Sequence, residues 1–153
     1  MLRISDFLCR KAINTNIESK DKKGAINELI EMLVKEKKVK DISKAVQSVM
    51  DREKIGTTGV GQGIAIPHSR TDAVSELIGA FGISKKGIDF ESLDGEPVNL
   101  IFLILSPPDT GGQHLRALAR ISRLFKDKFF RQALIDATTV EEAIRIIEQE
   151  DTY

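Results

Sequence analysis

Apolar residues in the first third of the chain recur at the spacing of an amphipathic helix. The recurring positions that follow Asp21 are Ile26, Leu29, Ile30 and Leu33. Intervals of three and four place such residues on one helix face, and an aspartate ahead of them is a common N-cap. We therefore expect a helix from Asp21 to about residue 36. A second helix is expected to begin at a cap, either Asp41 or Ser43, and to end near Arg52.

Alternating and continuous apolar runs predict the strands. Region 13–17 alternates as a first strand would, after a short opening helix over 4–8. Region 64–66 alternates apolar residues with smaller neighbours, and 77–83 is expected to form the next strand. The run 98–105 is almost wholly apolar and has the length of a buried strand rather than of a helix.

Turn and cap signals divide the remainder of the chain. Lys85-Lys86-Gly87 predicts a turn, and helices are expected over 112–125 and 128–137. A last helix begins at Thr139, which forms an S/T-x-x-E capping box with Glu142. Helices thus precede and follow a block of strands. This order predicts an α/β (α+β) fold in which a single mixed β-sheet of about five strands is flanked by helices.

Length and charge narrow the class of protein. The 153 residues, without a repeat or a linker, predict one domain over 1–153. Lysine plus arginine and aspartate plus glutamate both total 23, so no basic excess points to nucleic acid or to a membrane surface. Small molecules or other proteins are the expected partners.

Cysteine usage and the N-terminus indicate the compartment. A lone Cys9 makes no internal disulfide, and no apolar segment of a signal peptide precedes it. The longest apolar run is far shorter than the ~20 residues of a membrane helix. We expect a cytoplasmic protein without direct membrane insertion.

The stretch 56–70 concentrates the chemistry of the chain. It holds four glycines from Gly56 to Gly63 and then His68, one of only two histidines. Glycine allows positive φ angles and a close approach of the backbone to an anionic group. Pro67 keeps the preceding residue extended, so that His68 is expected at the end of a strand.

Other sites rich in glycine or histidine do not fit this stretch. It lacks the Gly-Lys-Ser/Thr ending of a P-loop and misses the G-x-G-x-x-G dinucleotide fingerprint. The two histidines and the cysteine do not have the spacing of zinc ligands. We expect neither a nucleotide nor a metal.

These residues resemble a known family. The run Gly63-Ile64-Ala65-Ile66-Pro67-His68, with Arg52-Glu53-Lys54 upstream, is similar to the phosphohistidine motif of enzyme IIA of the bacterial phosphoenolpyruvate-dependent phosphotransferase system. The resemblance is to the fructose/mannitol type and its nitrogen-regulatory branch. It runs from about residue 4 to residue 148 and includes Gly87-Ile88-Asp89-Phe90, Leu93-Asp94-Gly95-Glu96-Pro97-Val98 and Gln113-His114-Leu115. One departure is Ser69, where the family usually has glycine.

The resemblance implies a role for each candidate site residue. His68 would be the phosphorylated nucleophile and attack through Nε2, since neutral imidazole both accepts and releases a phosphoryl group. His114 would bind the phosphoryl oxygens or orient His68, and Arg52 would stabilise the transferring charge. Further candidates for contacts with the phosphate or with a partner are Thr58, Gly63, Ser69 and Arg70.

Simpler interpretations stand beside these roles. Without the motif, His68 would be a structural histidine, and His114 a histidine on the surface of a helix. Arg52 and Arg70 could be ordinary solvated arginines, Arg70 being the weaker candidate. Threonine in a strand, such as Thr58, is common without any function.

The implied function is that of a phosphocarrier. His68 would accept a phosphoryl group from a histidine phosphocarrier protein, with phosphoenolpyruvate as the ultimate donor and no cofactor beyond the covalent phosphohistidine. The nitrogen-regulatory branch implies that the phosphorylation state then controls binding to targets such as transporters or sensor kinases. The alternative is a sugar-specific component that passes the phosphoryl group to a cysteine on a separate IIB protein during sugar uptake.

Overall fold

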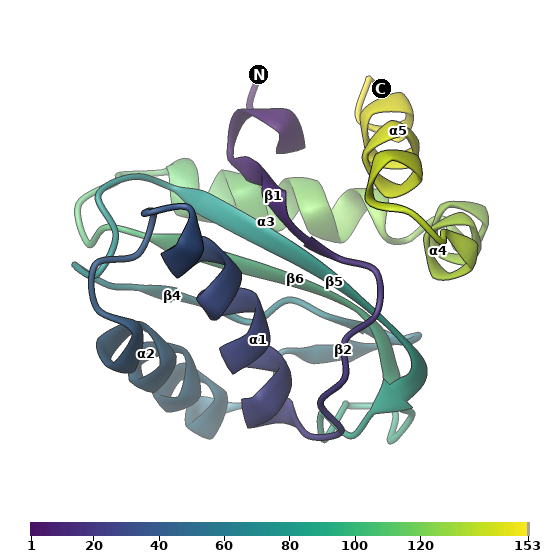
Figure 1. Ribbon diagram of the computed structural model, residues 1–153, viewed down its shortest axis with the longest axis horizontal. Coiled ribbons are helices and arrows are strands. Elements are labelled where there is room, and N and C mark those ends of the chain that lie inside the picture. Colours follow the sequence, from purple (N-terminus) through teal and green to yellow (C-terminus); the bar gives the residue numbers. More distant parts are fainter. Residues whose placement is uncertain (153) are drawn as a thin grey trace.

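The computed structural model describes residues 1–152, which fold around one mixed sheet (Figure 1). Its strands are β1 (Leu8–Asn14), β2 (Gly59–Gly61), β3 (Ile64–Ala65), β4 (His68–Arg70), β5 (Ile78–Ile88) and β6 (Val98–Ser106). The sheet order is β1-β5-β6-β3-β2, and β4 also pairs with β6. The expected single mixed sheet is confirmed, with six strands where about five were predicted.

The two central strands are apolar because both of their faces are covered. β5 and β6 pair antiparallel, with Phe81 opposite Phe102. All residues of β6 except Asn99 are buried. A strand buried on both faces loses the alternation of polar and apolar residues that marks a half-exposed strand. This explains the continuous apolar run of the sequence.

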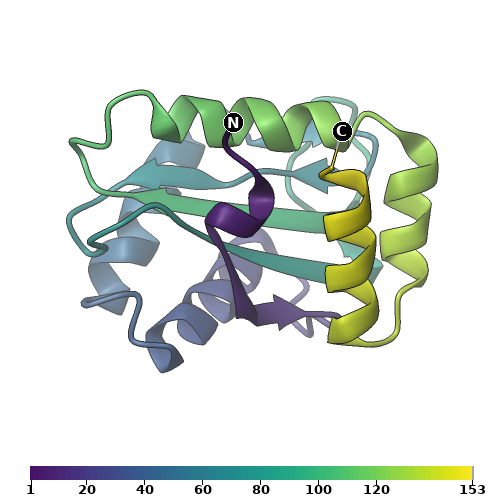
Figure 2. The same ribbon diagram turned by 90° about the horizontal axis from the view of Figure 1, so that it is seen from above.

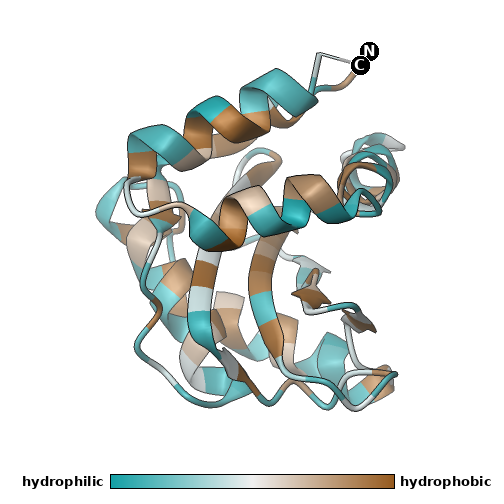
Figure 3. Cartoon of the chain, turned by 90° about the vertical axis from the view of Figure 1, so that its right-hand side faces the viewer, coloured by the Kyte–Doolittle hydropathy of each residue, from teal (hydrophilic) through white to brown (hydrophobic). Residues whose placement is uncertain are grey.

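Helices cover the two faces of the sheet (Figures 1 and 2). One face is packed by α1 (Lys22–Lys35) and α2 (Ile42–Ile55), and the other by α3 (Gln113–Leu124), α4 (Lys128–Asp136), α5 (Val140–Glu150) and the 3₁₀ turn Ile4–Asp6. The helices show bands of both hydrophobic and hydrophilic residues in Figure 3, as expected for elements with one buried side. None of the helices in residues 1–152 is long and apolar enough to cross a membrane.

The predicted helix starts are confirmed. Asp21 and Asp41 accept hydrogen bonds from the backbone N–H groups of Gly24 and Lys44, so that Asp41 rather than Ser43 caps α2. Thr139 caps α5 by accepting from the N–H of Glu142. Short polar side chains satisfy orphan N–H groups at helix N-termini, which makes these boundaries readable from sequence.

The predicted boundaries of two strands were wrong, and the register is irregular in each strand. β1 spans Leu8–Asn14 instead of 13–17, and its register shifts between Leu8 and Ile13. β5 continues to Ile88 through the predicted turn at 85–87, with a shift after Ile83 and a φ of 88° at Gly87. At both places five positions of one strand stand against two of its partner, and such an irregular ladder breaks the period of two on which the prediction depended.

A buried carboxylate at the end of α5 is bound both to α3 and to the beginning of the chain. Arg120 of α3 lies 2.8 Å from the carboxylate of Asp151, and both side chains are less than a tenth exposed. The other Asp151 oxygen accepts a 2.7 Å hydrogen bond from the N–H of Ile4. Asp151 therefore holds three separate segments together.

We predict that Asp151→Ala lowers the free energy of unfolding by about 3 kcal/mol, because it removes the buried carboxylate that pairs with Arg120 and that accepts from the N–H of Ile4. The matched control is Glu148→Ala on the same helix, whose contact with Arg10 is solvent-exposed. Exposed pairs contribute less than about 1 kcal/mol. Chemical denaturation of both variants measures the difference, and equal losses would contradict the assigned role of Asp151.

Candidate functional site

The strand β6 sets the position of His68. β4 runs parallel to β6, with His68 opposite Ile104 and Arg70 opposite Ser106. The N–H of Ile104 donates to the carbonyl of Pro67, which continues the ladder across the gap between β3 and β4. Proline has no N–H of its own, so the short strands β3 and β4 meet at this residue. His68 thus begins β4 and is partly buried, so the expectation that it ends a strand was wrong: the lead-in strand β3 stops at Ala65, before Pro67.

A backbone hydrogen bond determines which nitrogen of His68 is free. Nδ1 lies 2.7 Å from the carbonyl oxygen of Ile66. A carbonyl only accepts, so Nδ1 carries the proton and donates it. In the neutral ring, Nε2 is then left with its lone pair. The hydrogen bond at Nδ1 thus orients the ring and leaves Nε2, the nitrogen that the family resemblance implies for the attack, without a proton.

His114 lies beside His68, although the two residues are far apart in the sequence. It occupies the first turn of α3 and is 4% exposed, and its ring centroid is 5.5 Å from that of His68. Its Nδ1 lies 2.5 Å from the hydroxyl oxygen of Ser106, the last residue of β6. The interpretation of His114 as a surface residue is wrong, because the helix turns this side chain toward the sheet.

Burial keeps both imidazoles neutral at physiological pH. Desolvation is the main cause that lowers the pKa of His68, and the nearby Arg52 lowers this pKa further. Desolvation, together with the charges of His68 and Arg70, lowers the pKa of His114 to about 4. Neutral imidazole is the form that holds a nucleophilic lone pair.

The two candidate arginines approach the pair from different elements. Arg52, in the last turn of α2, donates to the carbonyl of Gly56 over 2.8 Å. Arg70 alternates with Ser69 on β4 and so shares the face of His68, and its guanidinium donates to the hydroxyl of Thr110. Arg52 lowers the pKa of His68 and Arg70 lowers the pKa of His114, so each histidine has a positive charge within electrostatic reach.

Thr58 has a structural partner. Its hydroxyl donates to the carboxylate of Glu53, and its N–H donates to the other oxygen of the same carboxylate over 3.1 Å. Lys22 lies 3.0 Å from Glu53 and compensates its buried charge. The Thr58 carbonyl accepts from the N–H of Ile66. Thr58 therefore supports the strand that leads to His68, with its hydroxyl proton already used.

Gly63 and Ser69 are not brought to the histidine pair. Gly63 has a φ of 79° in the β2–β3 hairpin, and its carbonyl binds Asn99 and Leu100. At about 3.3 Å per residue, the five positions between Asn99 and Ile104 separate it from His68 by about 16 Å. Ser69 is buried with its hydroxyl unpaired, and alternation turns it to the face opposite His68.

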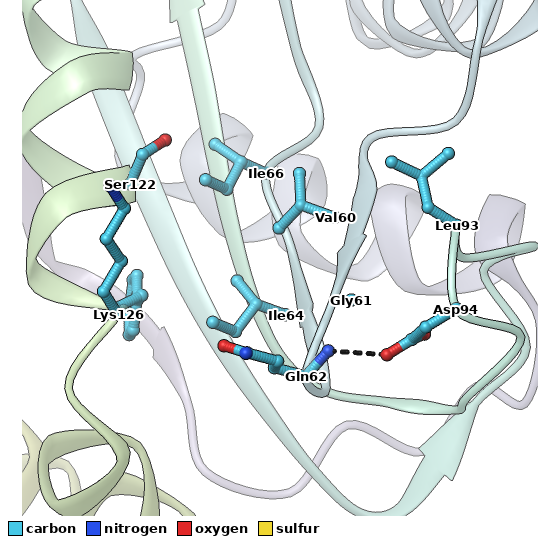
Figure 4. A pocket seen from close by; sticks show the side chains of 10 residues that line it. Val60, Gly61, Gln62, Ile64, Ile66, Leu93, Asp94, Ser122 and Lys126 are labelled. Carbon is cyan, nitrogen blue, oxygen red and sulfur yellow. Dashed lines mark hydrogen bonds between the residues drawn. The ribbon is translucent and has the colours of Figure 1, made fainter.

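A groove of about 790 Å³ flanks the site (Figure 4). Ser122 and Lys126 line one side of it and Leu93 and Asp94 the other, over a middle that includes Ile66. Because the Ile66 carbonyl also holds His68, the groove and the histidine pair share this residue. The groove was not predictable from the sequence, because its lining comes from segments far apart in the chain.

Two site residues were missed by the sequence analysis. Glu53 was quoted in the motif without a role, and Ser106 was not considered at all. A polar residue that ends a buried apolar strand, immediately before Pro107, was the available signal for Ser106. Residues 1–152 contain no group of three or more histidine, cysteine, aspartate or glutamate side chains arranged to hold a metal ion.

The chain belongs to a family known from other proteins. A mixed sheet with His68 at the start of β4 and His114 of α3 beside it defines the class, and the chain is a member of the family described as phosphoenolpyruvate-dependent sugar phosphotransferase system, EIIA 2, whose model matches residues 6–150.

Some relatives are named nitrogen regulatory proteins and others sugar-specific components. The chain is 40% identical over 125 residues to a nitrogen regulatory protein of Bradyrhizobium diazoefficiens, covering 82% of this chain and 81% of that one. It is 39% identical over 150 residues to a fructose-specific EIIABC component of Bacillus subtilis, covering 98% of this chain but only 24% of that protein. The crystal structure of the nitrogen regulatory protein IIA-Ntr from Neisseria meningitidis matches with a TM-score of 0.86 at 33% identity, covering 94% of this chain and 98% of that one.

The lowered pKa of His114 predicts a pH dependence of stability. The unfolded chain takes up a proton at this residue below about pH 6.5, whereas the native state does so only near pH 4. Stability is therefore full above pH 6.5 and is lost as the pH falls toward 4. At about 1.4 kcal/mol per pH unit, wild type should lose about 2 kcal/mol more than His114→Gln between about pH 7 and about pH 5.

Denaturation curves at the two pH values test this expectation. The exposed neighbour supplies the control, because Gln113→Ala should keep the dependence of the wild type. A His114→Gln variant with the same pH dependence as wild type would contradict a native imidazole that resists protonation.

Proposed function

We propose that the protein is a phosphocarrier in which His68 accepts a phosphoryl group from the phosphohistidine of a carrier protein. The observation that carries this proposal is the hydrogen bond from Nδ1 of His68 to the Ile66 carbonyl, which leaves Nε2 as a nucleophile of fixed direction. Membership of the EIIA 2 family supports it.

The transfer needs no general base. The Nε2 lone pair forms a bond to phosphorus while the N–P bond of the donor breaks, and that electron pair returns to the donor's imidazole. Nε2 has no proton to lose, and the proton on Nδ1 stays hydrogen-bonded to the Ile66 carbonyl throughout. Catalysis then depends on position and on stabilising the phosphoryl oxygens.

Arg52, Arg70 and His114 are suited to that stabilisation. The two arginines place positive charge near the histidines. His114 is neutral and adjacent to His68, so a ring N–H of His114 can donate a hydrogen bond to the phosphoryl oxygens. Preorganised donors of this kind are a large term in phosphoryl and acyl transfer.

We infer that the phosphorylation state of His68 serves regulation by changing which partners bind. Support comes from the relative named nitrogen regulatory protein, which is 40% identical over 125 residues, and from the IIA-Ntr crystal structure, which matches with a TM-score of 0.86. A phosphoryl group adds nearly two negative charges beside Arg70, which alters the affinity of any partner that docks there. Transporters and sensor kinases are the partner classes to test.

The alternative, transfer to a IIB cysteine in sugar uptake, requires another chain or domain. Cys9 lies on β1, which β5 and β6 separate from β4. Rapid transfer to a IIB protein, with no partner that distinguishes the phosphorylated from the unphosphorylated form, would favour this alternative.

The first test is the site of labelling. Incubation with phosphoenolpyruvate, enzyme I and the histidine phosphocarrier protein should give one acid-labile phosphoryl group on wild type and none on His68→Ala. His114→Ala keeps the nucleophile and serves as the comparison, so it should still be labelled. Labelling of His68→Ala to the wild-type level would overturn the proposal.

The second test separates assistance from acceptance. Arg52→Ala and His114→Ala should fold normally and accept the phosphoryl group about 100-fold more slowly, because each removes one stabilising donor. Arg145→Ala, an exposed arginine of α5 on the far side of the molecule from α2, is the control and should match wild type. Rapid-quench measurement of the phosphorylation rate decides the question, and wild-type rates in both variants would make the two residues structural.

A further inference from the structure

A buried hydroxyl contacts His114 on the side away from solvent. Ser106 ends β6 and is 0% exposed, and its carbonyl accepts a 2.8 Å hydrogen bond from Thr71. Its Oγ lies 2.5 Å from Nδ1 of His114. Within residues 1–152, Nδ1 of His114 is the one hydrogen-bond partner of this hydroxyl.

Only one placement of the proton satisfies both groups. If Nδ1 carried hydrogen and donated to Ser106, the hydroxyl proton would be buried without an acceptor, and an unpaired buried donor is costly. If the hydroxyl donates to Nδ1, its proton is used and Nδ1 acts as the acceptor. Neutral His114 then carries its hydrogen on Nε2.

We propose that Ser106 is a positioning residue that holds His114 in the tautomer with hydrogen on Nε2. This ring nitrogen becomes a fixed donor for the phosphoryl oxygens on His68. The inference rests on the proposed phosphocarrier function for its consequence, although the tautomer itself does not depend on any transfer.

The arrangement makes the two histidines complementary. The Ile66 carbonyl accepts a hydrogen bond from Nδ1–H of His68, so His68 presents a lone pair at Nε2. The Ser106 hydroxyl donates a hydrogen bond to Nδ1 of His114, so His114 presents N–H at Nε2. The opposite tautomer of His114 would direct a lone pair at the negative phosphoryl oxygens and repel them.

The low pKa of His114 supports the same assignment. With a pKa of about 4, the ring stays neutral at physiological pH, so a single proton must be shared between two nitrogens. The partner of Nδ1 therefore decides which nitrogen is the donor, as an orienting partner does for a metal-bound histidine.

The direct test is the tautomer in the unphosphorylated protein. Two-bond ¹H–¹⁵N correlation spectra of ¹⁵N-histidine-labelled protein at about pH 7 distinguish Nε2–H from Nδ1–H, and His68→Ala assigns the two rings. Wild type should show His114 with hydrogen on Nε2. Ser106→Ala should show a mixture of tautomers, and Ser106→Thr, which keeps the hydroxyl, should restore the wild-type pattern.

Ser84→Ala is the control, because Ser84 is also a buried serine of the central sheet but binds Gly87. Its spectrum should match wild type. Wild-type His114 with hydrogen on Nδ1, or a Ser106→Ala spectrum identical to wild type, would overturn the proposal whether or not any variant is phosphorylated.

The second readout is the rate of phosphorylation. Loss of a residue that orients a histidine typically costs 10- to 100-fold, so Ser106→Ala should accept the phosphoryl group at least about 10-fold more slowly. The loss should appear in kcat with KM unchanged, because the surface that meets the donor is intact. An unchanged kcat would overturn the role of Ser106, whereas failure of wild type to accept phosphate would refute the phosphocarrier function and leave the spectra valid.

Discussion

The end of β6 is the constraint on which the candidate site depends. Its last residues bind β4 through Pro67, Thr71 and the β4 register, and this fixes His68 and Arg70. The hydroxyl of Ser106 at the same end contacts His114 from α3. One buried strand thus positions two histidines that are 46 positions apart in the sequence. Such a strand is among the least mobile parts of a domain, because its hydrogen bonds are shielded and its side chains are packed on both faces.

A buried carboxylate supports the other side of the site. Glu53 receives both the N–H and the hydroxyl of Thr58, and Lys22 compensates its charge from α1. Since Thr58 in turn binds the N–H of Ile66, α1 and α2 are connected to the carbonyl-bearing residue that holds His68. Gly61 and Gly63 have positive φ angles in the β2–β3 hairpin, away from the histidine pair. Gly63 therefore shapes the segment that leads to His68 and is not brought to the pair as a phosphate contact.

The helices were predicted well because their signals are local. Caps at Asp21, Asp41 and Thr139 and the apolar stripes lie within single segments, and propensity acts there directly. The first strand was misplaced and the extension of β5 was missed. Both errors come from irregular register, which depends on the partner strand and is not visible in local alternation. Leu115 of α3 is 64% exposed, because the packing of this helix turns His114 and Ala117 to the sheet instead.

The sequence by itself determined the family, the mixed sheet, the helix starts and His68 as the candidate nucleophile, because motif and periodicity are properties of neighbouring residues. The tertiary structure decided which candidates meet. It brought His114 within 5.5 Å of His68, left Gly63 at a distant hairpin and turned Ser69 to the opposite face. It also determined which nitrogen of each histidine carries hydrogen, because the Ile66 carbonyl and the Ser106 hydroxyl reach the rings only after the strands have paired. Hydrogen-bond direction depends on contacts between segments, which no single stretch of sequence contains.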